Sequence, residues 1–189
     1  SASVFAANYN FVQDIPYYLG FLLIGGMLMI AAGYYLDYKE ENSKTKFQLL
    51  LSLLWTGAFA ALIFFNYICQ TTFIRHLALH YKPENDAVIS TFSMANPMSL
   101  SWSIEMWGYG ILGVATWLMA GYYKGKNNII RLLLISNGVL SLATVAFTII
   151  DINWVLTPAG IIAYMIWNVL MIVLMIMIYL NSKLSSAAE

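Results

Sequence analysis

Long apolar runs alternate with short polar segments along the chain. Five runs are long enough to form membrane-crossing helices, because about 20 apolar residues span the hydrocarbon core of a bilayer. The predicted spans cover residues 16–36, 47–69, 97–123, 129–150 and 158–180. Helical character continues after the second run to about residue 82, so the far end of that helix should stand in water or lie along the interface. The pattern predicts an all-α integral membrane protein, a five-transmembrane-helix bundle forming one domain over residues 1–189.

The prolines support these boundaries, since each lies at the end of a predicted helix. Pro16 opens the first run, where the missing proline N–H is not needed. The pairs Asn96-Pro97 and Thr157-Pro158 have the pattern of an N-cap followed by a first-turn proline. We therefore expect the third and fifth helices to begin at these pairs.

Composition favours lipid as the solvent. The 189 residues are 61% hydrophobic and only 10% charged, whereas soluble domains carry about 25% charged residues. We expect a multi-pass protein of the cell membrane whose immediate partners are membrane lipids. Nine basic and nine acidic residues give no net charge, which argues against a nucleic-acid partner. Self-association as a homo-oligomer stays open.

Basic residues predict the orientation of the bundle. With five spans, seven of them share one face, whereas only Arg75 and Lys82 lie on the other. The seven are Lys39, Lys44, Lys46, Lys124, Lys126, Arg131 and Lys183. Because positive residues stay in the cytoplasm, we expect the N-terminus outside and the C-terminus in the cytoplasm.

Polar residues recur at helical spacing within four of the predicted spans, so each set shares one face of its helix. We expect these faces to point inward, either as ordinary interhelical hydrogen bonds or as the lining of a polar cavity. The sets are Ser52, Thr56, Asn66 and Gln70; Ser101, Glu105, Gly108, Tyr109 and Thr116; Asn137, Ser141, Thr144, Thr148 and Asp151; and Thr157, Gly160, Tyr164 and Asn168.

Glu105 is the residue most indicative of function, because it is an acid placed inside an apolar run. An intramembrane acid is a functional candidate by default. With aromatic neighbours, a carboxylate can bind a lipophilic cation or exchange a proton for it. Two structural alternatives stay open. The acid can be satisfied by Asn66, Gln70, Arg75 or a neighbouring hydroxyl, or it can reach water at the interface.

The sequence thus predicts a binding or transport protein with an outward-opening polar-aromatic pocket for a small cation or a lipophilic molecule. The expected ligand-binding residues are Glu105, Trp102, Tyr109, Asn66, Gln70, Asp151 and Asn137. No Gly-rich phosphate loop and no pair of closely spaced cysteines is present, so we expect no cofactor.

Two alternative functions belong to other classes. His76 and His80 are four residues apart and share one helix face, which can chelate a metal, with Glu105 or Asp151 as a third ligand. A membrane-embedded enzyme acting on a lipid-like substrate would use Glu105 with these histidines. This is the less favoured interpretation, because the pair lacks the intervening acid of a zinc protease motif. The remaining alternative is a non-catalytic subunit that acts by helix docking.

Overall fold

A computed structural model describes residues 1–38 and 42–186, and this part of the chain is helical with no strand. Lys39, one of the basic residues used above for orientation, lies outside the described residues. Four stretches are long and apolar enough to cross a membrane. They are Phe11–Asp37, Ser43–Leu79, Asn128–Ile150 and Pro158–Lys183. The architecture is compatible with a membrane protein.

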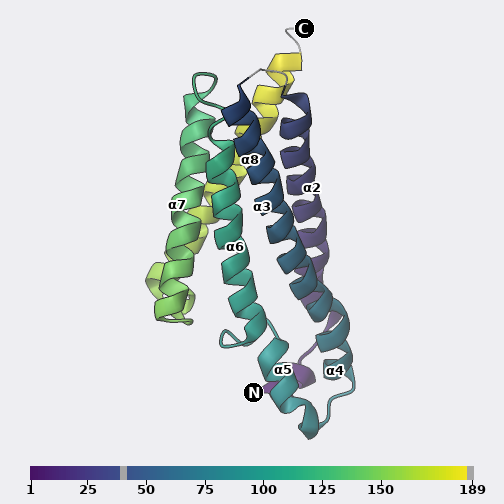
Figure 1. Cartoon of the computed structure of the whole chain (residues 1–189). Helices are drawn as coiled ribbons and strands as arrows, with labels where there is room; N and C mark the ends of the chain where they lie inside the picture. Colours follow the sequence, from purple (N-terminus) through teal and green to yellow (C-terminus); the bar gives the residue numbers. More distant parts are fainter. Residues whose placement is uncertain (39–41, 187–189) are drawn as a thin grey trace.

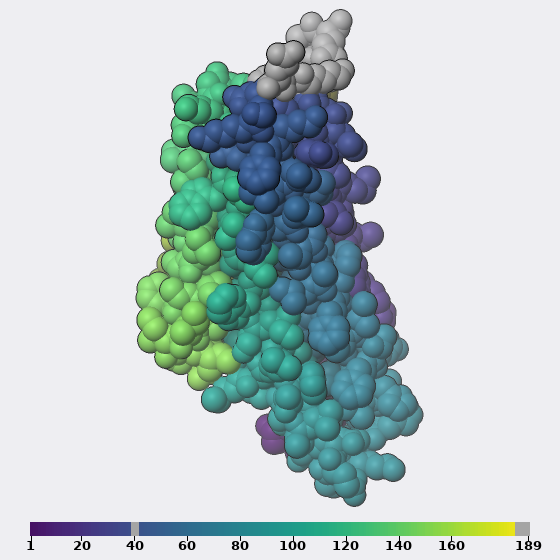
Figure 2. All heavy atoms as spheres, viewed as in Figure 1, coloured from purple at the N-terminus to yellow at the C-terminus, as the bar shows by residue number. Residues whose placement is uncertain are grey.

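The helices run back and forth between two ends, with the N-terminus at one end and the C-terminus at the other (Figure 1). The long helices are α2 (Ile15–Asp37), α3 (Ser43–Ile68), α6 (Leu100–Met119), α7 (Asn128–Ile150) and α8 (Pro158–Ser186). Short helices complete the N-terminal end: α1 (Ala2–Ala7), α4 (Arg75–Leu79), α5 (Asp86–Phe92) and the 3-10 turns η1 (Phe11–Asp14), η3 (Pro83–Asn85) and η4 (Trp154–Leu156). Side chains of α4 and α5 project beyond the bundle there (Figure 2).

The helical segment that forms the second predicted span changes its pitch before it ends. A π-helix, η2 (Cys69–Ile74), joins α3 to α4, so the helical segment reaches Leu79, close to the predicted residue 82. A π-helix has one more residue in each hydrogen-bonded turn than an α-helix and is often found at functional sites. The extension was predicted, but its change of pitch was not.

The third predicted run forms α6, which is the central helix and packs against both α3 and α7. It is not among the stretches that are apolar enough to cross a membrane on composition alone. Its neighbours explain this difference, because two packed faces leave little of the helix exposed and allow it to carry Glu105 and several glycines.

Glycines bring α6 close to α7. A Cβ atom added at Gly113 would lie 2.6 Å from the Ser141 Cβ and 3.2 Å from the Gly138 backbone oxygen. A Cβ added at Gly138 would lie 2.9 Å from the Gly113 oxygen. These two backbones approach each other directly, as small residues allow in packed helices.

Local capping confirms two of the predicted helix starts and corrects a third. Thr157 precedes α8, and its hydroxyl accepts a hydrogen bond from the Gly160 N–H at 3.2 Å. The helix α7 begins at Asn128, within one residue of the prediction. The expectation that Asn96-Pro97 starts the third helix was wrong: these residues lie in a turn, and Ser99 caps α6 by accepting from the Trp102 N–H at 3.0 Å.

Two apolar clusters of the core lie at different levels of the bundle. One joins α2, α3 and α6 and consists of Ile24, Phe59, Ala60, Ile63, Tyr67 and Leu112. The other lies near the C-terminal end of α6 and consists of Ala31, Met119, Ala120, Tyr123, Ile130, Leu134, Met171, Leu174 and Ile178. The helix α8 enters this second cluster only through its later turns. Its first turns pack against η4 and α7.

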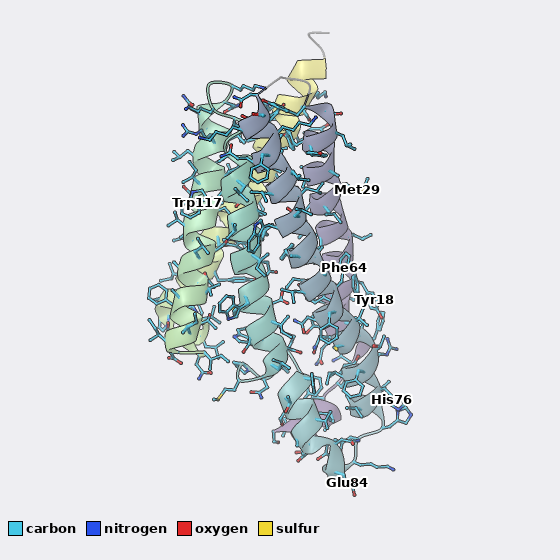
Figure 3. All side chains as sticks on the ribbon, viewed as in Figure 1. Tyr18, Met29, Phe64, His76, Glu84 and Trp117 are labelled. Atoms are coloured by element: carbon cyan, nitrogen blue, oxygen red, sulfur yellow. The ribbon has the colours of Figure 1, made fainter. Side chains whose placement is uncertain are left out.

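Large apolar side chains cover the outside of the bundle. Met29 on α2 is 76% exposed, and Trp117 on α6 also points outward (Figure 3). In the most apolar windows of α2 and α8, only 11% of the residues are buried. Soluble monomers rarely expose apolar surface on this scale.

We predict that Gly113→Ala lowers the free energy of unfolding by about 1–3 kcal/mol, because the new methyl group overpacks the α6–α7 contact. Thermal unfolding of purified protein in detergent would measure the change. Gly25→Ala is the matched control, because an added Cβ there meets nothing within 4 Å. Equal stability of the two variants would contradict the close contact.

Candidate functional site

Glu105 lies on the second turn of α6 and is buried, with 5% of its surface exposed. Two consecutive residues of α3 donate to its carboxylate: the Asn66 Nδ2 to Oε2 and the Tyr67 hydroxyl to Oε1, each at 2.9 Å. The side chain therefore faces its neighbouring helices. Asn66 is fully buried, and its amide also donates to the Ser101 carbonyl at 3.1 Å.

Gln70 extends this hydrogen-bonded network toward the N-terminal end. It belongs to η2, where its Nε2 donates to the Phe92 carbonyl at 2.8 Å and its Oε1 accepts from the Met94 N–H at 2.9 Å. Ser101 also donates to the Phe92 carbonyl, at 2.7 Å. The π-helix thus fastens the segment after α5 to the start of α6, on the N-terminal side of Asn66 and Glu105 in the bundle.

A cavity of about 280 Å³ lies beside this network, between α6 and the start of α8. Its lining consists of Met94, Trp102, Glu105, Met106, Tyr109, Val155, Leu156, Ile161 and Tyr164. Glu105 is the charged member, and three aromatic rings accompany it. The Trp102 Nε1 is buried and has no hydrogen-bond partner within the described part of the chain. The cavity therefore presents a carboxylate and aromatic rings.

A second cavity, of about 140 Å³, continues along α7 and α8. Met106, Tyr109, Val155 and Tyr164 line both cavities. The remaining lining residues are Leu140, Ser141, Ala143, Thr144, Phe147, Trp154, Ala163 and Trp167, and they include no charged side chain. The two cavities are therefore adjacent, and only the first is lined by a charged side chain.

Asn137 belongs to a different cluster. Its Nδ2 donates to the Thr116 hydroxyl, and its Oδ1 accepts from the Trp167 Nε1, both at 2.9 Å. These bonds join α6, α7 and α8, and Asn137 is fully buried. Its polar groups are satisfied by the protein, so its contacts are those of a structural residue.

Arg75 does not pair with Glu105, which corrects one of the structural alternatives. Its guanidinium lies 3.5 Å from Asp14, which is buried at the start of α2. Tyr9 donates to the same carboxylate oxygen at 2.5 Å. Burial and this hydrogen bond raise the pKa of Tyr9 above that of a free tyrosine, so the hydroxyl keeps its proton. The N-terminal segment is thereby tied to α4.

This N-terminal segment helps to enclose a third cavity, of about 260 Å³. Tyr9, Asp14 and Tyr17 line it on one side, and Gln70 and Met94 on another. Met94 also lines the cavity beside Glu105.

Sequence reasoning missed the ion pair between Asp14 and Arg75, because the residues are far apart along the chain and their spacing carries no signal of the contact.

The remaining predicted site residues lie apart from these contacts. Asp151 is exposed and accepts from the Asn153 N–H at 2.9 Å, as a turn residue. His76 and His80 are exposed, their rings 4.5 Å apart, and His76 projects from the N-terminal end in Figure 3. In residues 1–38 and 42–186, no group of three or more metal-binding side chains is found. The histidine metal site stays a prediction.

The inward-facing polar set is confirmed for α3, where Ser52, Thr56, Asn66 and Gln70 are all buried. It holds only in part for α8. Gly160 is buried and Tyr164 lines both cavities, but Thr157 is exposed and Tyr164 is itself 58% exposed.

Comparison with models of known protein families, with curated proteins and with solved structures finds no match for this chain.

We predict that Asn66→Ala lowers the free energy of unfolding by about 1–3 kcal/mol, because it removes a buried donor from Glu105. The loss should be non-additive with Glu105→Gln, with a coupling of about 0.5–3 kcal/mol in a double-mutant cycle. Thermal unfolding of the single and double variants measures the coupling.

Asn168→Ala serves as the control in the same cycle. The Asn168 amide donates to the Tyr164 carbonyl within its own helix, at 2.8 Å. Its effect should add to that of Glu105→Gln. If the effect of Asn66→Ala also adds to that of Glu105→Gln, the two residues are not energetically coupled.

Proposed function

We propose that this chain is an integral membrane protein that binds or transports a small lipophilic cation at Glu105. The observation that carries the proposal is the cavity of about 280 Å³ that joins Glu105 to Trp102, Tyr109 and Tyr164. A buried carboxylate attracts a cation, and aromatic faces add cation–π stabilisation that is strongest where water is excluded. Apolar residues such as Ile161 and Leu156 complete the walls, which favours a ligand with an apolar body.

Hydrogen bonding at Glu105 supports a binding role in a specific way. Asn66 and Tyr67 hold the two carboxylate oxygens in place from α3. The cavity also reaches Glu105 and extends from it toward α8. A cation can therefore approach a carboxylate whose orientation is already fixed, which lowers the cost of ordering the site. The same bonds also suit a structural acid, and the Glu105 variant below distinguishes the two roles.

The proposed topology has five crossings. The four more apolar helical stretches each cross the membrane, and α6 crosses it as well. Described basic residues at the C-terminal end of the bundle include Lys44, Lys46, Lys124 and Lys183. This end then faces the cytoplasm. The cavity beside Glu105 includes Val155 and Leu156 from the loop before α8, so it lies in the outer half of the bundle.

We predict that an impermeant maleimide labels Glu84→Cys in intact cells but labels Lys124→Cys only after permeabilisation. Both residues are exposed in the structure, and α6 lies between them along the chain. A Cys69→Ser background removes the single native cysteine. Labelling of both sites from the same side would show that α6 does not cross the membrane.

We predict that Glu105→Gln weakens binding of benzyltrimethylammonium by roughly tenfold, because it removes the negative charge and retains the shape of the side chain. Titration of protein in phosphatidylcholine nanodiscs, followed by calorimetry, gives the dissociation constant. The amide oxygen of the variant can still accept from Asn66 or Tyr67, so the fold should survive, as a thermal unfolding curve would verify.

His76→Ala is the control for this measurement, because the exposed His76 does not line the cavity. Its dissociation constant should equal that of the wild type. Unchanged affinity in Glu105→Gln would refute cation binding at this acid.

A further inference from the structure

The adjoining cavities differ in chemistry, and together they specify the shape of a ligand. The cavity at Glu105 contains a carboxylate and three aromatic residues. The cavity along α7 and α8 has mainly apolar and aromatic walls, with Ser141 and Thr144 among the lining residues and no charged side chain. At about 140 Å³, it is close to an apolar protein cavity of about 150 Å³ that holds a benzene-sized group. It has room for one chain or ring and not for two acyl chains.

Four lining residues are common to the two cavities, which makes the cavities direct neighbours. Met106 and Tyr109 come from α6, Val155 from η4, and Tyr164 from α8. Ligand sites usually measure about 300–1,000 Å³. Each cavity alone falls below this range, whereas a ligand that occupied both would fill a volume within it.

The exposed mouth of the groove indicates where a ligand enters. Ile161 is 51% exposed and Tyr164 58% exposed, and both are on α8. These side chains lie on the outer surface of the bundle, beside the first turns of α8, which remain outside the core clusters. In a membrane, this mouth opens toward lipid and not only toward water.

Resting on the proposed function, we infer that the ligand is a single-chain amphiphile with an ammonium head. The head lies between Glu105 and the rings of Trp102, Tyr109 and Tyr164, and the chain extends into the groove between Phe147, Ala163 and Trp167.

The test compares two cationic probes that share a head and differ in their body. Dodecyltrimethylammonium carries a chain long enough to enter the second cavity, whereas benzyltrimethylammonium fills only the cavity at Glu105. Ala163→Phe places a ring in the second cavity, which Ala163 lines. Dodecyltrimethylammonium should then bind roughly fivefold or more weakly, which corresponds to one to two fewer buried methylene groups. Benzyltrimethylammonium should bind as to the wild type.

Two further variants keep the test independent of folding defects. Val169→Phe is a matched change on the same helix at a residue that is 62% exposed, and it should leave both affinities unchanged. Ala143→Leu enters the same cavity from α7 and should reproduce the selective loss for the long probe. Binding to empty nanodiscs is subtracted in every titration.

The outcomes separate the two proposals. Equal affinity of the long probe for wild type, Ala163→Phe and Ala143→Leu would overturn the chain-binding groove, as would equal weakening of both probes by these variants. Competition by dodecyl maltoside as strong as that by dodecyltrimethylammonium would overturn the selectivity for an ammonium head. If Glu105→Gln binds benzyltrimethylammonium as tightly as the wild type does, the proposed cation site itself is overturned.

Discussion

The position of α6 is the constraint on which the rest of the structure depends. This helix carries a carboxylate, and a carboxylate without partners is costly inside an apolar environment. Burying it requires donors from a neighbour, which Asn66 and Tyr67 supply from α3. It also requires close helix contact, which Gly113 and Gly138 allow on the α7 side. The long helix that carries the buried acid therefore occupies the centre, between α3 and α7.

The same arrangement produces the cavities. Because α3 and α7 occupy two sides of α6, α8 reaches the core only through its later turns, around Met171 and Leu174. Its first turns follow η4 directly and pack beside it. The space between α6 and these turns is lined by the face of α6 that carries Trp102 and Tyr109. The two cavities thus follow from where α8 enters the core.

Local patterns predicted the helices well, because apolar run length and proline position act within a few residues of each boundary. The start of α8 at Pro158 and the buried polar face of α3 are examples. Sequence spacing also selected Glu105, Asn66, Gln70, Trp102 and Tyr109, which the structure brings around one network and its cavity. It could not show that Asn137 bonds to Trp167, or that Arg75 pairs with Asp14, since both contacts depend on how distant helices pack.

The wide turn at Cys69–Ile74 allows the chain to change its length by one residue in one place. A residue removed from a helix that keeps its α-helical pitch rotates everything that follows by about 100°, whereas a turn that changes from π-helical to α-helical pitch absorbs the loss. Deleting one residue there would therefore leave Arg75 facing Asp14, and the first residues of the chain would keep their anchor. Losses of a single residue should be tolerated better in this turn than along the rest of α3.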